Sequence, residues 1–458
     1  MTRGGEPVDI REAVQQAERD GVRLVRFIYC DNGGLIRGKA ASLRGLESRM
    51  SSGIGLTPAM QVFNMFDHLA PRPDLGLGAT GEIRLVPDPS TYRRLPYAPR
   101  SAQVICDLMT VDKRPWPACT RTFLKQQVAT AAGAGLRIMA SFENEWMLVR
   151  REGDSFVPAG EQMYGSTIAF NESEDLTQEL VENLEGVGLE VEQYFPEYAD
   201  AQHEITIAPT EALEAADNQV LFREVIRGTY QRHGLMATFT PKAFLDDAGN
   251  GAHVHLSIWD SADQRNLLYD SSDQFGTSRL GYHFIAGVVA HLRALVALTC
   301  PSVNSYRRLI PSAWASAYTC YGYDNREATV RIASTFWGRE SKSANIEVRA
   351  ADPSCNPYLA MGAILAAGLD GIERKLDPGE PVPVDPATMP EDERRRRGIR
   401  LVPQSIPQAL TELEQDEVLR KAMGELLYES FVTVKKSEYE FCKEKGFEFE
   451  QKHHIYKF

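Results

Sequence analysis

The chain has 458 residues, 43% hydrophobic and 25% charged, which is the composition of a folded globular protein and not of a disordered or fibrous one. Its length predicts at least two domains. The formal net charge of -13 argues against nucleic-acid binding, and it suits a cytoplasmic protein whose anionic ligands arrive with metal cations or meet local groups of arginines.

Three further features bear on the class of protein. The first twenty residues include Arg3 and Glu6 and lack an apolar stretch, so we expect no secretion signal. The apolar run 283–300 contains His291 and Arg293, which predicts a buried helix and no contact with a membrane. Seven cysteines form no CxxC pair, and we expect them to be buried, reduced thiols.

The first hundred or so residues are predicted to form a β-rich domain. The stretch 22–30 alternates as a strand does, Asp31-Asn-Gly-Gly34 is a strong hairpin turn, and 35–39 is the returning strand. Repeated prolines from Pro71 to Pro117 separate this domain from a helical segment that begins near Cys119. We place the boundary so that the domains are 1–112 and 113–458.

Beyond the boundary, helical and strand patterns alternate. Asn356 is a good N-cap for a helix with Pro357 at its first position. The basic run 394–397 is interpreted as a solvated turn or helix face. The predicted helices are 120–134, 176–184, 211–234, 281–298, 357–376 and 406–429.

One predicted strand carries two carboxylates in an apolar setting. In Ala140-Ser-Phe-Glu-Asn-Glu-Trp-Met-Leu-Val149, Glu143 and Glu145 are two residues apart and therefore lie on the same face. Like charges that close repel each other. Both can stay ionised only beside a metal ion, an arginine or bulk water.

Three more strand-like segments carry polar clusters. Glu197 and Glu204 lie close in sequence, with His203 beside Glu204. His253 and His255 share one face of a strand, and so do Glu347 and Arg349. Taken singly, each has a plainer interpretation, because a glutamate pair or a Glu-x-Arg is commonly a solvated surface feature and His-x-His is more often surface or core than ligand.

Taken together, these clusters favour a metal site. Five carboxylates and a histidine on separate strands suit one or two Mg²⁺ or Mn²⁺ ions. The arginine-rich segments 304–311 and 324–332 add cations for carboxylate or phosphate ligands. Divalent metals with several arginines are typical of phosphoryl transfer, and the chain has neither a Walker A sequence nor the kinase loop set.

The ordered motifs resemble those of glutamine synthetase of the bacterial type I class, over nearly the whole chain. The resemblance implies an α+β fold, with an N-terminal β-grasp domain and a large catalytic domain that has a curved antiparallel sheet with flanking helices. It also implies a homo-oligomer, a dodecamer of two stacked hexameric rings with active sites between neighbouring subunits. The motifs are Asp31-Asn-Gly-Gly-Leu-Ile-Arg-Gly-Lys39, Phe142-Glu-Asn-Glu145, Gln202-His-Glu204, Gly249-Asn-Gly-Ala-His-Val-His255, Asn304-Ser-Tyr-Arg-Arg308 and Ile346-Glu-Val-Arg349 through Asn356-Pro-Tyr-Leu359.

The resemblance also implies roles for individual residues. Glu145, Glu197 and Glu204 would hold a first metal ion, and Glu143, His253 and Glu347 a second that also touches the ATP phosphates. Gly249, Arg308 and Arg349 would bind glutamate. His255 and Ser257 would contact the nucleotide, and Arg326 and Arg331 would stabilise the transferring phosphoryl group. Asn345 replaces an arginine of the family, so Lys342 or Arg339 is expected to contact the ATP phosphates instead.

The implied reaction activates the glutamate γ-carboxylate with ATP and then couples the γ-glutamyl phosphate to an amine. Ammonia-using members carry a glutamate on a flap over the site, where this chain has Trp314, and an aspartate in the small domain, where a loose alignment places Thr57. Ammonium needs acids to hold it and to take its proton. We therefore expect a larger acceptor, an organic primary amine such as ethanolamine, an alkylamine, a polyamine or an arylamine, giving a γ-glutamylamide.

Three alternatives remain open from the sequence. Trp314 could simply fill space in a divergent flap. The protein could be a glutamine synthetase that uses ammonia through an altered site. It could also be a catalytically inactive structural or regulatory oligomer, although all six expected metal ligands and both glutamate-binding arginines are present.

Overall fold

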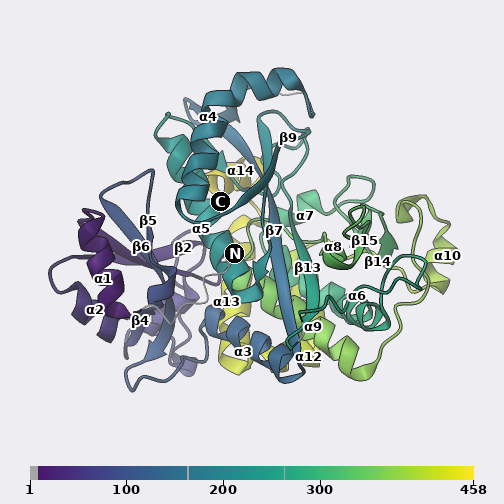
Figure 1. Cartoon of the computed structure of the whole chain (residues 1–458), viewed down its shortest axis with the longest axis horizontal. Helices are drawn as coiled ribbons and strands as arrows, with labels where there is room; N and C mark the ends of the chain where they lie inside the picture. Colours follow the sequence, from purple (N-terminus) through teal and green to yellow (C-terminus); the bar gives the residue numbers. More distant parts are fainter. Residues whose placement is uncertain (1–8, 162–163, 263) are drawn as a thin grey trace.

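The computed structural model describes residues 9–161, 164–262 and 264–458. A smaller N-terminal sheet lies beside a larger unit built on a long, curved sheet with helices packed against it (Figure 1). The predicted α+β fold class is confirmed. All seven cysteines are buried and free, as expected.

The N-terminal sheet contains the predicted hairpin. Phe27 on one arm lies opposite Lys39 on the other, so the two arms pair antiparallel across the turn at Asp31. Two helices cover this sheet, although only strands were predicted there from the sequence. Ala13 and Ala17 of the first helix are buried. Across the sheet the strands are β2 (Ile36–Ser42), β1 (Leu24–Cys30), β6 (Ser101–Thr110), β4 (Ile83–Pro87) and β3 (Ile54–Leu56), with β5 (Arg93–Arg94) on β6; the helices are α1 (Ile10–Arg19) and α2 (Leu46–Ser52).

A buried arginine joins the two units. Arg121, in α3 (Thr120–Gly133), donates hydrogen bonds to Asp88 at 2.9 Å and Asp107 at 3.1 Å in the N-terminal unit. It also donates to Asp217 at 2.7 Å in α5 (Ala212–Gln231). Three carboxylates around one guanidinium satisfy its charge in a buried position. The exact boundary at 112/113, between β6 and α3, stays a prediction.

The large sheet places every strand that was expected to carry chemistry. Its central strand runs from Leu136 to Glu152, and the side chains from Leu136 to Glu145 alternate between buried and partly exposed, because one face packs on the core. In order the strands are β14 (Tyr318–Tyr323), β15 (Ala328–Ala333), β16 (Asn345–Val348), β13 (Ala252–Asp260), β7 (Leu136–Glu152), β10 (Gln202–Ile207) and β9 (Val191–Pro196), with β8 (Ser155–Pro158), β11 (Thr210–Glu211) and β12 (Met236–Thr238) also on β7. All pairs are antiparallel except β14 with β15.

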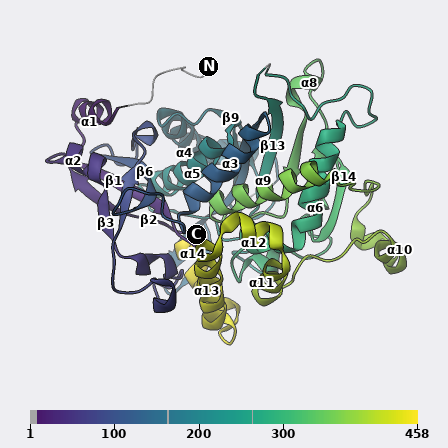
Figure 2. The same cartoon turned by 90° about the horizontal axis from the view of Figure 1, so that it is seen from below.

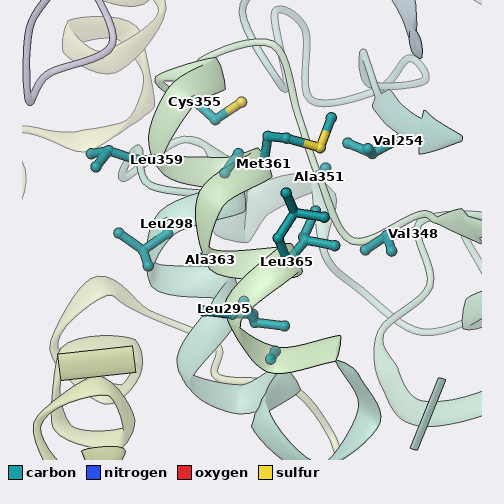
Figure 3. Close-up of a cluster of buried hydrophobic side chains, with 14 of the residues drawn as sticks. Val254, Leu295, Leu298, Val348, Ala351, Cys355, Leu359, Met361, Ala363 and Leu365 are labelled. Carbon is teal, nitrogen blue, oxygen red and sulfur yellow. The ribbon is translucent and has the colours of Figure 1, made fainter. Parts of the chain in front are cut away.

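Two long helices form the core behind this sheet, α6 (Arg279–Thr299) and α9 (Pro357–Arg374), with α9 capped by Asn356 as predicted. Figure 2 shows them side by side, and Figure 3 shows Leu295 and Leu365 in the buried cluster between them and the sheet. A Cβ on Gly287 would lie 2.2 Å from the carbonyl oxygen of Ala367, so the two backbones touch there and a larger residue would push them apart.

By length and composition alone α6 could cross a membrane, with a mean hydropathy of 1.4 over its most apolar window. However, 61% of that window is buried inside the molecule, where α6 packs against α9 and α11 (Ile406–Gln415). The prediction of a buried core helix in this part of the chain is confirmed.

The prediction of one helix over 406–429 is wrong. The chain forms three helices there, α11, α12 (Glu417–Met423) and α13 (Glu425–Cys442), because Asp416 has an extended backbone and caps the N–H of Leu419, and Gly424 has a φ of 73°. The basic run 394–397 lies on and just after a short helix with i,i+4 ion pairs, as expected. The remaining helices are α4 (Thr167–Gly186), α7 (Ser305–Arg308), α8 (Glu340–Ser343), α10 (Glu391–Arg396) and α14 (Gly446–Lys457).

Candidate active site

Three carboxylates meet where β7, β10 and the end of β9 come together. Glu204 lies directly opposite Glu145 in the antiparallel register, and Glu197 follows the last residue of β9. One oxygen from each lies within 4.8 Å of the others. Glu145 is held in place by the N–H of Gly251 at 2.8 Å and by the amide of Gln202 at 3.2 Å. Strand register therefore brings together the set expected for the first metal ion.

The electrostatics of this set call for a cation. Burial and the nearby Glu145 raise the pKa of Glu197 to about 7. Burial, Glu143 and Glu145 raise the pKa of Glu204 well above its usual range. Among the described residues no lysine or arginine forms an ion pair with Glu145, Glu197 or Glu204. Three clustered carboxylates with no such ion pair among the described residues fit the oxygen-ligand preference of a divalent cation.

A second set lies on the neighbouring strands β7, β13 and β16. His253 Nδ1 is 3.2 Å from Glu143 and 3.5 Å from Glu347, while His255 Nε2 is 3.4 Å from Glu143 and 3.7 Å from Glu347. Either histidine can therefore join the two carboxylates, and ligand atoms of Glu143, His255 and Glu347 all lie within 4.8 Å of one another. We call the two sets, seven residues with both histidines included, the carboxylate cradle.

The two histidines differ in charge. Burial and the charge of Arg349 lower the pKa of His253, which keeps its ring neutral. Burial opposes protonation of His255, but Glu347 and Glu143 outweigh it and raise its pKa to about 9. A neutral imidazole is the form that ligates a metal, whereas a cation faces an anionic ligand better. This difference favours His253 as the ligand and His255 as a contact for phosphate.

Arginines line one side of the cradle. Arg331 on β15 lies opposite Glu347 and pairs with it at 3.0 Å, and Arg349 pairs with the same carboxylate at 2.5 Å. Burial and the charges of the nearby Arg326 and Arg349 lower the pKa of Arg331, although the charge of Glu347 acts in the opposite direction. Arginines that repel one another around a single carboxylate leave positive charge available for an anion.

The residues expected to bind glutamate lie at one end of the cradle. Arg308, in α7, is buried, with Nη2 3.4 Å from His253 Nε2. Its alkyl chain passes over Gly249, where a Cβ would lie 2.4 Å from the carbonyl oxygen of Pro241 and 3.1 Å from Arg308 Cγ. Gly249 is therefore required by close packing. With Arg349 nearby, two guanidinium groups are available for the carboxylates of an amino acid.

Residues 311–316, which we call the acceptor flap, follow α7 and lead to β14. Trp314 is 68% exposed. Its carbonyl oxygen accepts a hydrogen bond from Arg349 at 3.4 Å, so the flap lies beside the expected glutamate site. Ser312, Trp314 and Ser316 all have positive φ, between 55° and 60°. Each such residue costs roughly 1–3 kcal/mol when it is not glycine, so surrounding contacts must hold the flap.

The other expected contacts are more scattered. Ser257 lies two residues beyond His255 on β13 and accepts a hydrogen bond from the indole of Trp259. Asn345, in the position of the family arginine, bonds the ring of His255 at 2.9 Å, while Lys342 is exposed on α8. Thr57 caps a short 3-10 helix in the N-terminal unit, where its hydroxyl donates to Gly78. Within one chain its hydrogen bonds therefore lie outside the cradle and flap.

Sequence reasoning missed two residues of this site. Tyr164 is 62% exposed, and burial together with the charge of Glu197 raises the pKa of its hydroxyl. No motif marks it, because it lies in a connection between β8 and α4. Glu327 accepts a hydrogen bond from the N–H of Trp314 at 2.8 Å. It follows Arg326, a predicted site residue, directly in the sequence, and this position is the feature that could have indicated its role.

Comparison with known proteins identifies the family. Residues 117–454 match the family model for the glutamine synthetase catalytic domain, and residues 9–116 match that for the glutamine synthetase N-terminal domain. The chain belongs to the glutamine synthetase family. Members of this family are ATP-dependent ligases that use divalent metals, and the carboxylate cradle supplies the donor set that such ions need.

Relatives and solved structures agree with this assignment over nearly the whole chain. A gamma-glutamylpolyamine synthetase of Streptomyces coelicolor is 35% identical, covering 95% of this chain and 94% of its own. A glutamine synthetase of Methanocaldococcus jannaschii is 33% identical, covering 95% and 96%. A solved GmaS/ADP complex superposes with a TM-score of 0.83 at 28% identity, covering 97% and 98%. This member of the glutamine synthetase family thus resembles both glutamine synthetases and a gamma-glutamylamide-forming enzyme.

Proposed function

We propose that this glutamine synthetase family member joins glutamate to an organic primary amine and forms a γ-glutamylamide. The observation that carries the proposal is Trp314, an exposed indole on the acceptor flap beside Arg349, at the position where ammonia-using members place a carboxylate. An indole offers an apolar and cation-π surface to an alkylammonium group, and it cannot accept a proton from ammonium. The similarity to a gamma-glutamylpolyamine synthetase supports the same acceptor class.

The proposed reaction has two steps. First, an oxygen of the glutamate γ-carboxylate attacks the γ-phosphorus of ATP, ADP leaves, and γ-glutamyl phosphate forms. Second, the amine nitrogen attacks the γ-carbonyl carbon, the carbon–oxygen bond to phosphate breaks and phosphate leaves, and the proton lost by the nitrogen passes to the phosphate or to solvent. Bound Mg²⁺ or Mn²⁺ would neutralise phosphate charge in this site.

The chain's own residues position the reactants in this proposal. Arg308 and Arg349 bind the carboxylate groups of glutamate, and Gly249, which the Arg308 side chain packs against, lies beside it. Arg326 and Arg331 stabilise charge on the transferring phosphoryl group, where preorganised guanidinium groups act most strongly. His255 and Ser257 contact the nucleotide, and Lys342, exposed on its short helix, reaches the ATP phosphates.

We further propose a cytoplasmic dodecamer of two hexameric rings. Family members are commonly oligomeric, and Thr57 lies in the N-terminal unit, away from the cradle of its own chain. A neighbouring subunit would bring Thr57 to the acceptor side of this chain's site. Sedimentation velocity tests the assembly, and a monomer with full activity would contradict it.

A second candidate is ammonia-dependent glutamine synthesis. The 33% identity to an archaeal glutamine synthetase favours it. Trp314 argues against it, because no acidic side chain lies within the acceptor flap itself.

The deciding experiment is phosphate release with ATP, Mg²⁺ and glutamate against ammonium, ethanolamine, alkylamines, polyamines and arylamines, with products identified by mass. We expect at least one organic amine to exceed ammonium in kcat/KM. Ammonium equal to or better than every organic amine would contradict the proposal and favour the second candidate. No turnover with any amine, in metal-replete protein that binds ATP, would support an inactive structural or regulatory oligomer.

A further inference from the structure

The acceptor flap has a backbone that needs an anchor. Ser312, Trp314 and Ser316 alternate with residues of ordinary conformation, and all three have the left-handed φ that side chains disfavour. A loop with three such residues keeps this conformation only while surrounding contacts hold it.

In this structure Glu327 supplies such a contact. Its Oε1 accepts the N–H of Trp314 at 2.8 Å, and its carboxylate also accepts the N–H of Ser316. Glu327 is 13 residues from Trp314, on the turn between β14 and β15, so it belongs to a different element from the flap. This carboxylate is therefore not the flap glutamate of ammonia-using relatives, whose position Trp314 takes.

The turn that carries Glu327 is itself fixed. Its N–H donates to Asn325 Oδ1 at 3.0 Å, and the amide of Asn325 donates to the carbonyl oxygens of Val382 and Val384 at 2.8 and 2.9 Å. The same segment holds the start of the flap, because Asp385 accepts the hydroxyl of Ser312 at 2.9 Å. A rigid support therefore presents the Glu327 carboxylate to the flap.

The charge of Arg349 acts on the Glu327 carboxylate, and Arg349 itself bonds the flap. Among the described residues, no lysine, arginine or histidine forms an ion pair with it. It is partly buried, and burial raises its pKa although the Trp314 N–H lowers it. The flap N–H groups are thus the main hydrogen-bond donors to this carboxylate.

The contacts that hold the flap also reach the expected glutamate site. Arg349 donates to the carbonyl oxygens of Trp314 at 3.4 Å and Arg326 at 2.9 Å, and to the hydroxyl of Ser316 at 3.3 Å. The flap is consequently held from one side by Glu327 and from the other by Arg349. Its position relative to the bound amino acid depends on both.

From these contacts we infer that Glu327 is a positioning residue for the amine: its carboxylate holds residues 314–316 in the observed conformation and so sets the position of the Trp314 wall against which the acceptor binds. This inference rests on the proposed amine-ligase function. Glu327 acts through the flap and does not touch the reacting atoms. It therefore determines how well the amine binds and leaves the phosphoryl-transfer step unchanged.

The test compares Glu327→Ala, which removes both hydrogen bonds to the flap, with Glu327→Gln, which keeps a carbonyl oxygen for the Trp314 N–H. We expect the alanine variant to raise the KM of the preferred organic amine about tenfold or more, the size expected for losing hydrogen bonds to a charged group. The KM values for ATP and glutamate and the value of kcat should change less than about threefold. The glutamine variant should recover most of the loss.

A matched control is Glu373→Ala, which removes an exposed carboxylate near the end of α9. It should leave all three KM values unchanged. An alanine variant with normal amine KM, or with a fall in kcat at constant amine KM, would overturn the inference.

A second measurement separates this inference from the proposed function. Hydrogen exchange of a peptide covering 310–318 should be at least about tenfold faster in Glu327→Ala than in the wild type, whatever amine the enzyme uses. Unchanged exchange would refute the role of Glu327 in holding the flap, even if an organic amine is the substrate. Faster exchange in a protein that prefers ammonium would support that role of Glu327 and contradict the proposed organic-amine substrate.

Discussion

The carboxylate cradle and the acceptor flap belong to one site, yet they are held in opposite ways. Cradle residues lie on or directly beside paired strands, so register fixes their positions; Glu145 must face Glu204 as long as β7 pairs with β10. The flap has no ladder, carries three left-handed residues and exposes Trp314. A few hydrogen bonds, chiefly to Glu327 and Arg349, hold it in place.

This difference teaches where specificity can change at little cost. A one-residue slip in the sheet would move every cradle side chain to the wrong face and destroy the metal set. A substitution in the flap alters one wall of the site and leaves the sheet intact. In the proposed mechanism, phosphoryl transfer therefore depends on the rigid region, and acceptor choice on the loosely held one.

The strongest test of the rigid region is Glu204→Ala. Changes to groups that merely support metal ligands typically cost about 10–100-fold, so loss of a ligand should lower kcat by more than about 100-fold with every amine. The metal-free fold should survive, because removing one of three repelling carboxylates relieves charge repulsion. Steady-state phosphate release and thermal unfolding measure the two effects.

Glu192→Ala is the matched control, since Glu192 is an exposed residue of β9 near the same set. It should leave kcat and unfolding near wild type. If Glu204→Ala kept full activity with normal unfolding, the metal assignment would be wrong.

At the junction of the two regions, Arg308→Lys should raise the KM for glutamate about 10- to 100-fold. Lysine keeps the charge but loses the planar fork, and hydrogen bonds between charged groups are worth about 1.5–3 kcal/mol. The KM for ATP should stay within about threefold. Initial rates with glutamate varied at saturating ATP check this, and equal increases in both KM values would indicate a general disturbance of the site.

Within the flap, Trp314→Glu should shift the ratio of kcat/KM for ammonium to that for the preferred organic amine by about tenfold toward ammonium. The new carboxylate can hold ammonium and accept its proton, and the indole wall is gone. Trp314→Phe is the control, because it keeps an aromatic wall and should keep the preference. An unchanged ratio in the glutamate variant would mean that Trp314 only fills space.

The smallest expected effect lies in the helices beneath the cradle. His291 of α6 is bonded by Asp416 at 2.6 Å and Asp370 at 3.1 Å, and Asp370 also pairs with Arg374. Burial opposes its protonation, but the two aspartates outweigh burial and raise its pKa. The stabilisation is therefore present below the unfolded pKa of about 6.5 and is lost as pH rises through the higher folded pKa.

His291→Gln should accordingly lower the free energy of unfolding by about 1 kcal/mol more at pH 6 than at pH 9, as measured by urea denaturation. Asp370→Asn removes one partner of the histidine and should reduce this pH dependence. Equal destabilisation at both pH values would show that the histidine charge does not contribute. The flap should exchange hydrogen at the same rate in this variant as in the wild type.

Much of the rigid region could be predicted from the sequence, because strand alternation is a local pattern. Residues two apart on a strand share a face for that reason alone, as in Glu143 with Glu145, His253 with His255, and Glu347 with Arg349. The resemblance of the ordered motifs to a known family predicted that the separate strands meet at one site. The flap was less predictable, since its left-handed residues are held by Glu327, which lies 13 residues from Trp314 on the turn between β14 and β15. Tyr164 was not predicted either, because it lies in a connection between β8 and α4 where no motif marks it.

The helical predictions failed where side chains compete with the backbone. The segment 406–429 has the spacing of one helix, but Asp416 bonds the N–H of Leu419 and Gly424 takes a positive φ, so the chain turns twice. In the N-terminal domain, α1 and α2 are short and lie between stronger strand signals. Hydrophobic periodicity alone can neither locate the breaks between the helices in 406–429 nor distinguish the short helices α1 and α2 from strands.

The predicted hairpin turn near the start of the chain has a consequence for the order of folding during synthesis. Asn32 bonds Ser430, 398 residues away, and the carbonyl oxygens of Cys30 and Asp31 accept the amide of Asn356. The turn therefore cannot reach its final surroundings until the ribosome has made the chain as far as Ser430. Contacts so distant in sequence slow folding and leave apolar surface exposed while the chain grows, so the nascent protein should depend on chaperones more than its ordinary size suggests.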